Sequence, residues 1–250
     1  MSAREPVKRN FVRLAGTRFH DVTWFRNVDS TNRYLLQRAA AGAAEGEVAV
    51  ADEQTAGHGR LGRSWVAPPG SALLVSVLLR PELPPERVHL VTLAAGLAAL
   101  DALHTLGAPA VVAAPEPIAL KWPNDVVIGD RKLAGILAEA DGGGAVVVGM
   151  GCNVRPDALA PELREIAVAA AVDREDLLVE WLRAYDARLA GLDRVVADAA
   201  ACSATLGRRV RVELARETFA GTAEALTEEG YLVVDGRTVN AGDVVHLRTT

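Results

Sequence analysis

The chain has 250 residues, of which 50% are hydrophobic and 24% are charged, and its formal net charge is -5. This composition is typical of a soluble globular protein that is long enough to bury a large core. An acidic chain without a basic stripe argues against nucleic-acid binding. The longest apolar stretch, residues 88–107, is interrupted by His89, Asp101 and His104, so it predicts a core helix and no membrane span.

Two cysteines cannot build a disulfide framework, and they lack the Cys/His spacing of a zinc site. The first sixteen residues, "MSAREPVKRNFVRLAG", contain no long apolar core of the kind that a secretory signal needs. We therefore expect a cytoplasmic protein.

The first part of the chain predicts a mixture of strands and helices. The strongly apolar run "ALLVSVLL" is typical of a strand that is covered on both faces. Polar residues at 29–31 are suited to cap the first helix. Strands are predicted over residues 19–25, 46–54 and 72–79, and helices over residues 29–42 and 88–107.

The second part adds further strands, one long amphipathic helix and a change of composition. Gly129 and Asp130 separate two strand-like runs and predict a hairpin. Beyond residue 205, short β-like runs alternate with Gly and Asp turns and resemble an SH3-like module. We therefore predict a large main domain over residues 1–204, the candidate catalytic domain, and a small β domain over residues 205–250. Strands are predicted over 118–122, 126–129, 132–140, 145–154, 232–234 and 244–247 and around Val210 and Val212, and a helix over 173–192.

A glycine-rich segment, "GHGRLGRSW" (57–65), places Arg60 and Arg63 between glycines. Glycine lets backbone N–H groups approach an anion closely, and guanidinium groups suit carboxylate or phosphate oxygens. The segment does not match the phosphate-binding P-loop, because no Lys-Ser/Thr pair follows. An anion-binding loop and a flexible surface loop are equally compatible with this pattern.

The chain contains three lysines, Lys8, Lys121 and Lys132, and every other cation is arginine. Lys132 begins an apolar strand beside Gly135, where a compact ammonium could reach into a cleft. Lys121 precedes Trp122 and Pro123, and Asn124 and Asp125 then present an amide and a carboxylate. Asp125 is suited to bind a magnesium-bridged phosphate or to orient a polar substrate group. Solvated strand ends would be the alternative.

Two further segments have both a structural and a ligand-binding interpretation. In "DSTN" (29–32), Ser30 and Thr31 are good helix caps, but two hydroxyls and an amide also suit a polar ligand. Gln54 ends a strand, a place where ligand sites are common. In "GMGCNV" (149–154), the exposed backbone and Asn153 could receive an adenine edge or simply pack tightly. Cys152 is more often a small buried hydrophobe than a nucleophile.

Taken in order, these segments resemble the biotin protein ligase family. The series "STN", Gln54, "GHGRLGRSW", "KWPNDV", "KLAGIL" and "GMGCNV" occurs at the family's spacing, and the resemblance runs from about residue 20 to the end. It implies an α/β (α+β) class II synthetase-like mixed sheet flanked by helices, followed by an SH3-like barrel. It also implies that biotin and MgATP form biotinyl-5′-adenylate, from which biotin passes to a lysine of a biotin carboxyl carrier domain of an acyl-CoA carboxylase.

The resemblance also implies roles for individual residues. Biotin would be held by its ureido ring at the "STN" segment and Gln54, under the glycine-rich loop, and the adenosine by Trp65 and Asn153. The implied catalytic residues are Lys132 at the reacting carboxyl, Arg60, Lys121 and Asp125. The implied biotin residues are Ser30, Thr31, Asn32, Gln54, Gly57, His58, Gly59, Arg60, Lys132 and Gly135. The implied ATP residues are Arg60, Arg63, Trp65, Asn124, Lys132 and Asn153, with magnesium entering with ATP.

Two departures from the family pattern matter. His58 stands where many relatives have arginine, so a side-chain contact at this position is an open question. The residues before Phe19 are too few for the DNA-binding helix-turn-helix of bifunctional members, so we expect a ligase without repressor activity.

Three alternatives are a lipoate or octanoate ligase on the same scaffold, a non-catalytic biotin-sensing module and a general nucleotide-binding domain. The glycine-rich loop and the terminal β module argue against the first, and the presence of both Lys132 and Arg60 argues against the second. We expect no membrane and no nucleic-acid partner, and both a monomer and a homodimer are compatible with the scaffold. The loop is expected to fold when ligand binds.

Overall fold

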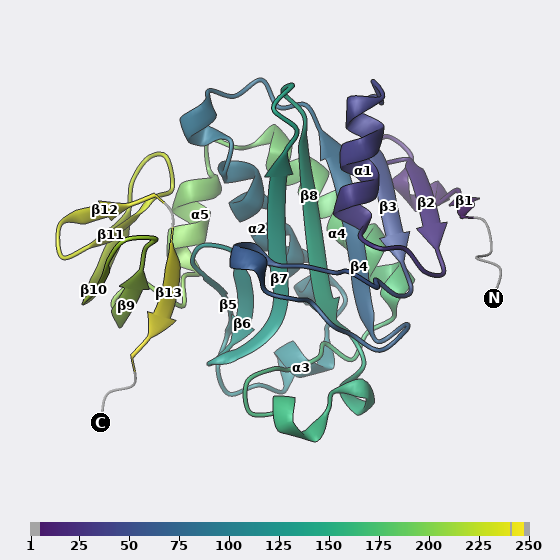
Figure 1. Ribbon diagram of the computed structural model, residues 1–250. Coiled ribbons are helices and arrows are strands. Elements are labelled where there is room, and N and C mark those ends of the chain that lie inside the picture. The colour runs from purple at the N-terminus through teal and green to yellow at the C-terminus, as the bar shows by residue number, and fades with distance from the viewer. Residues whose placement is uncertain (1–5, 241, 248–250) are drawn as a thin grey trace.

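A central eight-stranded sheet organises the chain (Figure 1), in a computed structural model that describes residues 6–240 and 242–247. The strand order is β1-β2-β3-β4-β8-β7-β6-β5. The β2/β3 pair is parallel and the six other adjacent pairs are antiparallel, so the sheet is mixed, as predicted. The strands are β1 (Val7–Arg9), β2 (Asp21–Phe25), β3 (Glu47–Ala51), β4 (Ala72–Leu79), β5 (Ile118–Lys121), β6 (Asp125–Ile128), β7 (Arg131–Ala140) and β8 (Val146–Asn153).

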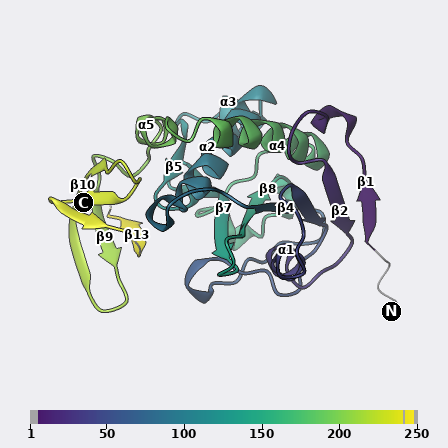
Figure 2. The ribbon, with the colours of Figure 1, turned by 90° about the horizontal axis from the view of Figure 1, so that it is seen from above.

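Helices cover both faces of this sheet (Figure 2). Helices α2 (Leu90–Thr105), α4 (Arg174–Ala190) and α5 (Val195–Ala201) lie on one face, and α1 (Thr31–Ala40) lies on the other. Every residue of β4 is buried between these layers, as its strongly apolar run predicts. The short helices are α3 (Pro109–Val112) and the 3-10 turns η1 (Val12–Leu14), η2 (Arg60–Gly62), η3 (Pro85–Arg87), η4 (Pro156–Ala158) and η5 (Pro161–Leu163).

Helix α2 is the core helix that the sequence predicts. With the turn before it, the stretch Pro85–Thr105 is, among the described residues, the one helix long and apolar enough to cross a membrane. However, 67% of its most apolar window is buried inside the molecule. Two hydrogen bonds fix α4 against it, from Trp181 Nε1 to the Ala95 carbonyl at 3.0 Å and from Tyr185 Oη to the Val91 carbonyl at 2.8 Å.

The C-terminal part forms a five-stranded antiparallel sheet of order β12-β11-β10-β9-β13. This agrees with the predicted small β module, although β12 and β13 are edge strands without mutual pairing in the described residues. The sequence interpretation located β9, β11 and β13 but did not single out β10 and β12. The outermost predicted domain residues, 1–5 and 248–250, lie outside the described residues. The strands are β9 (Arg209–Glu213), β10 (Thr218–Leu226), β11 (Leu232–Val234), β12 (Arg237–Val239) and β13 (Asp243–His246).

Trp122 joins the two sheets. Its side chain is buried in the hydrophobic cluster of the C-terminal sheet, beside residues such as Val212 and Leu232. Its Nε1 donates to the Gly230 carbonyl at 3.1 Å, and its backbone N–H donates to Thr205 Oγ1 at 3.0 Å. Because Trp122 follows Lys121 directly, the C-terminal sheet fixes the position of the predicted catalytic segment.

Candidate functional site

The site begins at the amino terminus of α1. Ser30 is the N-cap of this helix, and its hydroxyl accepts from the Arg33 N–H at 3.4 Å, so helix capping accounts for this residue. The next residue, Thr31, is buried, and its N–H and Oγ1 both donate to Gln54 Oε1, at 2.7 and 3.0 Å. Because β3 ends at Ala51, Gln54 lies in the loop after the strand and does not end the strand, contrary to the sequence interpretation. The two hydrogen bonds join this loop to the start of α1.

A buried polar floor continues from Thr31 to Asn32. Ser76 Oγ lies 2.7 Å from Thr31 Oγ1 and 2.6 Å from Asn32 Oδ1, and all three residues are buried. Buried polar groups need partners, so this arrangement holds the two side chains in defined orientations. The sequence interpretation missed Ser76, although it is the one polar residue in the apolar run 72–79 and could have been noticed on that basis.

Two glycines of β8 let side chains approach the sheet. A Cβ atom at Gly149 would fall far inside van der Waals contact with Asn32 Oδ1, and one at Gly151 would lie 2.5 Å from the Trp65 ring. The "GMG" motif therefore serves close packing in this structure, in keeping with one of the two interpretations of that segment.

Lys132 and Asp125 form an ion pair of 2.7 Å across β6 and β7. The ammonium also lies over the Trp65 ring, 5.5 Å from its centroid. Beside them, Asn124 Nδ2 donates to the Ile136 carbonyl at 2.7 Å, which fixes the segment after Pro123. Lys121 lines the same cavity. Both lysines thus border one cavity instead of standing at unrelated strand ends.

The glycine-rich loop folds as a short hairpin over the sheet. The Gly59 N–H donates to the Arg63 carbonyl at 2.6 Å, and the Trp65 N–H donates to the Gly57 carbonyl at 2.9 Å. A Cβ atom at Gly57 would lie 2.7 Å from the Trp65 carbonyl oxygen, so this position needs glycine for close packing. Whether the loop is ordered before ligand binds stays a prediction.

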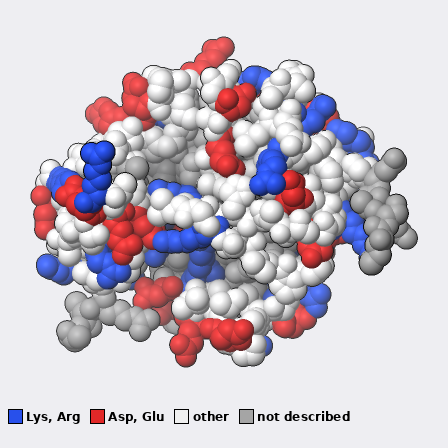
Figure 3. All heavy atoms as spheres, in the orientation of Figure 1, with Lys and Arg blue, Asp and Glu red and all other residues white. Residues whose placement is uncertain are grey.

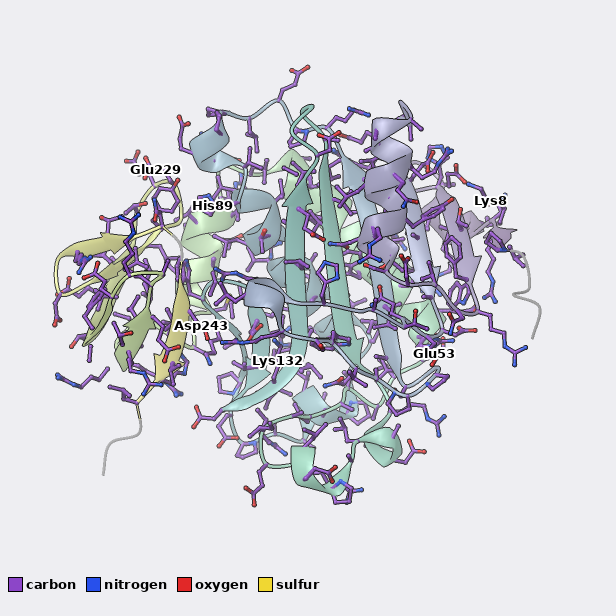
Figure 4. All side chains as sticks on the ribbon, in the orientation of Figure 1. Lys8, Glu53, His89, Lys132, Glu229 and Asp243 are labelled. Atoms are coloured by element: carbon purple, nitrogen blue, oxygen red, sulfur yellow. The ribbon has the colours of Figure 1, made fainter. Side chains whose placement is uncertain are left out.

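The two loop arginines contact the C-terminal sheet. Arg60 Nη2 donates to the Gly242 carbonyl at 3.0 Å, and Arg63 pairs with Asp243 on β13. Figure 4 shows Asp243 on β13 at the edge of the C-terminal sheet that faces the large sheet, where Lys132 lies. Burial lowers the pKa of Arg60, which still stays charged. Burial alone would raise the pKa of Asp243, but Arg63, Lys121 and Arg60 outweigh it and lower that pKa.

These elements enclose a cavity of about 320 Å³. Four cations line it against two carboxylates, a balance of four minus two, or +2, that favours an anionic ligand. Figure 3 shows lysine and arginine gathered in the hollow between the two sheets. The predicted residues on its wall are Ser30, Thr31, Asn32, Gln54, His58, Gly59, Arg60, Arg63, Trp65, Lys121, Asn124, Asp125, Lys132 and Gly135.

Two predicted residues lie elsewhere. Gly57 does not line the cavity and packs against Gln54 and the Trp65 backbone. Asn153 lines a second cavity of about 410 Å³, which shares Trp65 and Lys132 with the first. Its Nδ2 donates to the Val168 carbonyl at 3.2 Å. The buried Trp65 Nε1, at the boundary of the two cavities, has no hydrogen-bond partner among the described residues.

Comparison with known proteins decides the family. The model of the biotin/lipoate A/B protein ligase family matches residues 24–157, which is more than half of the chain, and that of the biotin protein ligase C-terminal domain matches residues 205–247. The chain belongs to the biotin/lipoate A/B protein ligase family. Its similarity to the biotin–[acetyl-CoA-carboxylase] ligase of Mycobacterium tuberculosis is 41% identity, over 94% of this chain and 92% of that protein.

Solved structures of this family share the fold. The biotin protein ligase of Aquifex aeolicus in complex with biotin and ATP has a TM-score of 0.77 at 26% identity and covers 92% of this chain and 100% of its own. The Leishmania major ligase with biotinyl-5-AMP has a TM-score of 0.59 at 26% identity, covering 91% and 98%. The predicted fold class, the mixed sheet followed by the C-terminal β module, is therefore confirmed.

Proposed function

We propose that this protein is a ligase that activates biotin with ATP and transfers it to a lysine of a biotin carboxyl carrier domain. The observation that carries the proposal is one cavity that joins the buried polar floor of Thr31, Asn32 and Ser76 to the cations Arg60 and Lys132. A neutral polar head group and an anionic tail fit these two ends. The identity to the Mycobacterium tuberculosis ligase supports the same reaction.

In the first step, a carboxylate oxygen of biotin attacks the α-phosphorus of ATP. A new P–O bond forms, the bond to the leaving pyrophosphate breaks, and biotinyl-5′-adenylate results. Two anions must approach each other, and Lys132 and Arg60 offset that repulsion and stabilise the charge of the transition state. Asp125 holds the Lys132 ammonium through the 2.7 Å ion pair. Most of the acceleration then comes from positioning and electrostatics.

In the second step, the amine of a carrier lysine attacks the activated carbonyl carbon. An amide bond forms, the C–O bond to AMP breaks, and the amine gives up a proton. The two cavities meet at Trp65 and Lys132. We assign the first cavity to biotin and the second to adenosine, so that the acyl carbon lies where Lys132 borders both.

The individual roles are proposals supported by placement around these cavities. The biotin head group is assigned to the polar floor, and the loop with Gly57, His58 and Gly59 is assigned to its cover. Arg63, Asn124 and Lys121 are assigned to phosphate and carboxylate oxygens, and Asn153 with Trp65 to the adenosine.

Magnesium is proposed to enter with the ATP phosphates. Among the described residues, no group of three metal-ligating side chains is present. Magnesium usually keeps several waters and binds through one or two carboxylates together with phosphates. Asp125 and Asp243 are the carboxylates that border the cavity, and both already face cations.

We further propose a cytoplasmic protein that acts on the carrier without nucleic acid or membrane, as a monomer or homodimer. The net charge of -5 supports the expectation about nucleic acid, since DNA-binding domains are normally basic. The boundary between residues 204 and 205 is likewise a proposal, supported by the C-terminal family match that begins at residue 205.

The transfer reaction is tested by the mass of an apo carrier domain incubated with the protein, ATP, magnesium and either biotin or lipoate. The proposal expects a single biotinyl addition on the carrier lysine with biotin and none with lipoate. Addition of lipoyl but not biotinyl groups would instead support the lipoate-ligase alternative.

A further inference from the structure

Glu139, near the end of β7, contacts both the floor of the cavity and the loop above it. Its Oε2 accepts from Asn32 Nδ2 at 2.7 Å, and its Oε1 lies 3.3 Å from His58 Nε2. The side chains of Glu139 and His58 are each about one-third exposed, at 30% and 32%. One carboxylate therefore joins the start of α1 to the glycine-rich loop.

On the floor, Glu139 determines which way the Asn32 amide points. A carboxylate only accepts hydrogen bonds, so it fixes the amide nitrogen on its own side. The same nitrogen lies 3.3 Å from the Leu137 carbonyl oxygen, and the amide oxygen faces Ser76 Oγ at 2.6 Å. The donor and acceptor ends of Asn32 are thus fixed in relation to any ligand in the cavity.

On the loop, His58 provides a link to the large sheet. Its Nδ1 lies 3.3 Å from the Ala56 carbonyl oxygen and its Nε2 faces Glu139, so both ring nitrogens point at oxygen atoms. Arg60 and Arg63 hold the same loop to the C-terminal sheet. The loop therefore contacts the protein on two sides, and the His58–Glu139 contact is the one that joins it to β7.

We propose that Glu139 is a positioning residue that couples the closed arrangement of the loop over residues 55–66 to the orientation of Asn32, and so sets the affinity for the head group of biotin. The identity of the ligand rests on the proposed function, whereas the coupling itself does not. It also gives the His58 side chain a role at the position where the family pattern often has arginine.

Trypsin provides a test without ligand, because the loop contains Arg60–Leu61 and Arg63–Ser64 bonds. Cleavage after Arg63 is measured by mass spectrometry relative to cleavage after the exposed Arg216 of the same chain. Glu139→Ala and His58→Ala should each accelerate loop cleavage about fivefold, and the double variant should cleave no faster than either, as coupled residues do.

Conservative variants separate this contact from general packing. Glu139→Gln keeps an oxygen for Asn32 and offers an N–H to a neutral His58 ring, and His58→Arg can pair with the carboxylate. Both variants should return the rate of loop cleavage to within about twofold of the wild-type rate. An exposed pair contributes only a small free energy, so modest differences in its strength change the rate little. Glu228→Ala, on the exposed surface of the C-terminal part, is the matched control and should change nothing.

Steady-state kinetics with varied biotin provide a second test. Glu139→Ala should raise the KM for biotin about tenfold while kcat stays within about twofold, because uniform binding is lost and the transition-state contacts remain. Unchanged loop cleavage in both alanine variants would overturn the proposal, as would additive effects in the double variant. A lack of biotin-dependent activity in the wild type would contradict the proposed function, and the ligand-free cleavage would still decide the coupling.

Discussion

At the scale of single residues, two of the three lysines of the chain stand where a compact charge borders the central cavity. Lys121 and Lys132 border the central cavity, and Lys8 lies far from it on β1 (Figure 4). Arg60 supplies the planar group that contacts both Asn124 and the C-terminal sheet. The compact ammonium group of lysine and the planar guanidinium group of arginine are not interchangeable. We therefore expect that arginine at position 132 and lysine at position 60 are each poorly tolerated.

Lys132→Ala should lower the single-turnover rate of adenylate formation about 10²- to 10³-fold, the usual loss for one group that stabilises developing charge. Biotin binding should change little, because the polar floor is untouched. Rapid-quench measurement of the adenylate gives the rate, with Lys8→Ala as the control for a lost lysine. A rate within a few-fold of wild type in Lys132→Ala would remove Lys132 from the reacting centre.

Most residues that the motifs predicted line one cavity, but some of their partners could not be predicted. Glu139 and Asp243 reach the site from strands that are distant in the sequence, and each lies in an otherwise ordinary run, whereas Ser76 could have been noticed as the one polar residue of its run. Their roles depend on the sheet register and on the docking of the C-terminal sheet. Neither can be read from local spacing, since a shift of one residue would turn each side chain to the other face.

At the scale of elements, sequence periodicity located the central strands and the long helices, but the sequence interpretation included neither β1 nor the short helix α5. The missed strand β10, "TFAGTAEAL", is rich in alanine, glycine and polar residues, so its pattern is weak, and tertiary pairing with β9 and β11 defines it. The glycines of β8 show the reverse case. Their spacing was visible, but their packing against Asn32 and Trp65 was one of two open interpretations.

Gly151→Ala should raise the KM for ATP about tenfold, because the added methyl group would force Trp65 from between the two cavities. Gly191→Ala is the control, since a Cβ atom there would meet only the Ala187 carbonyl oxygen at 3.8 Å. Steady-state pyrophosphate exchange at varied ATP measures the effect. Equal KM values for the two variants would mean that Trp65 does not contact the nucleotide.

At the scale of the whole molecule, the two sheets behave as one structure because side chains of one complete the other. Trp122→Ala should lower the free energy of unfolding by about 3–5 kcal/mol, the usual loss for a large buried aromatic side chain. Denaturant unfolding followed by far-ultraviolet circular dichroism measures this. A loss below about 1 kcal/mol would show that the small core does not depend on this residue.

His246 makes the junction sensitive to pH. Burial and the charges of Lys121 and Arg208 lower its pKa from 6.5 to about 4, and its Nε2 lies 3.1 Å from Thr205 Oγ1. Between pH 6.5 and 4 the unfolded chain binds this proton more readily, so stability should fall as the pH falls through that window.

The loss attributable to His246 should be on the order of 1 kcal/mol after allowance for solvent screening. Chemical denaturation at several pH values should therefore give a flatter stability profile for His246→Gln than for wild type in that window. The lowered pKa of Asp243 acts below its ordinary value of 3.8, outside the window. Identical profiles would contradict a neutral, half-buried His246.

The exchange of labelled pyrophosphate into ATP is the first measurement to make, because activation of biotin in this cavity is reversible and returns pyrophosphate to ATP. We expect exchange by the wild-type protein that requires biotin, requires magnesium and fails with lipoate. If folded protein shows no exchange with biotin, or equal exchange with lipoate, the cavity does not activate biotin as proposed.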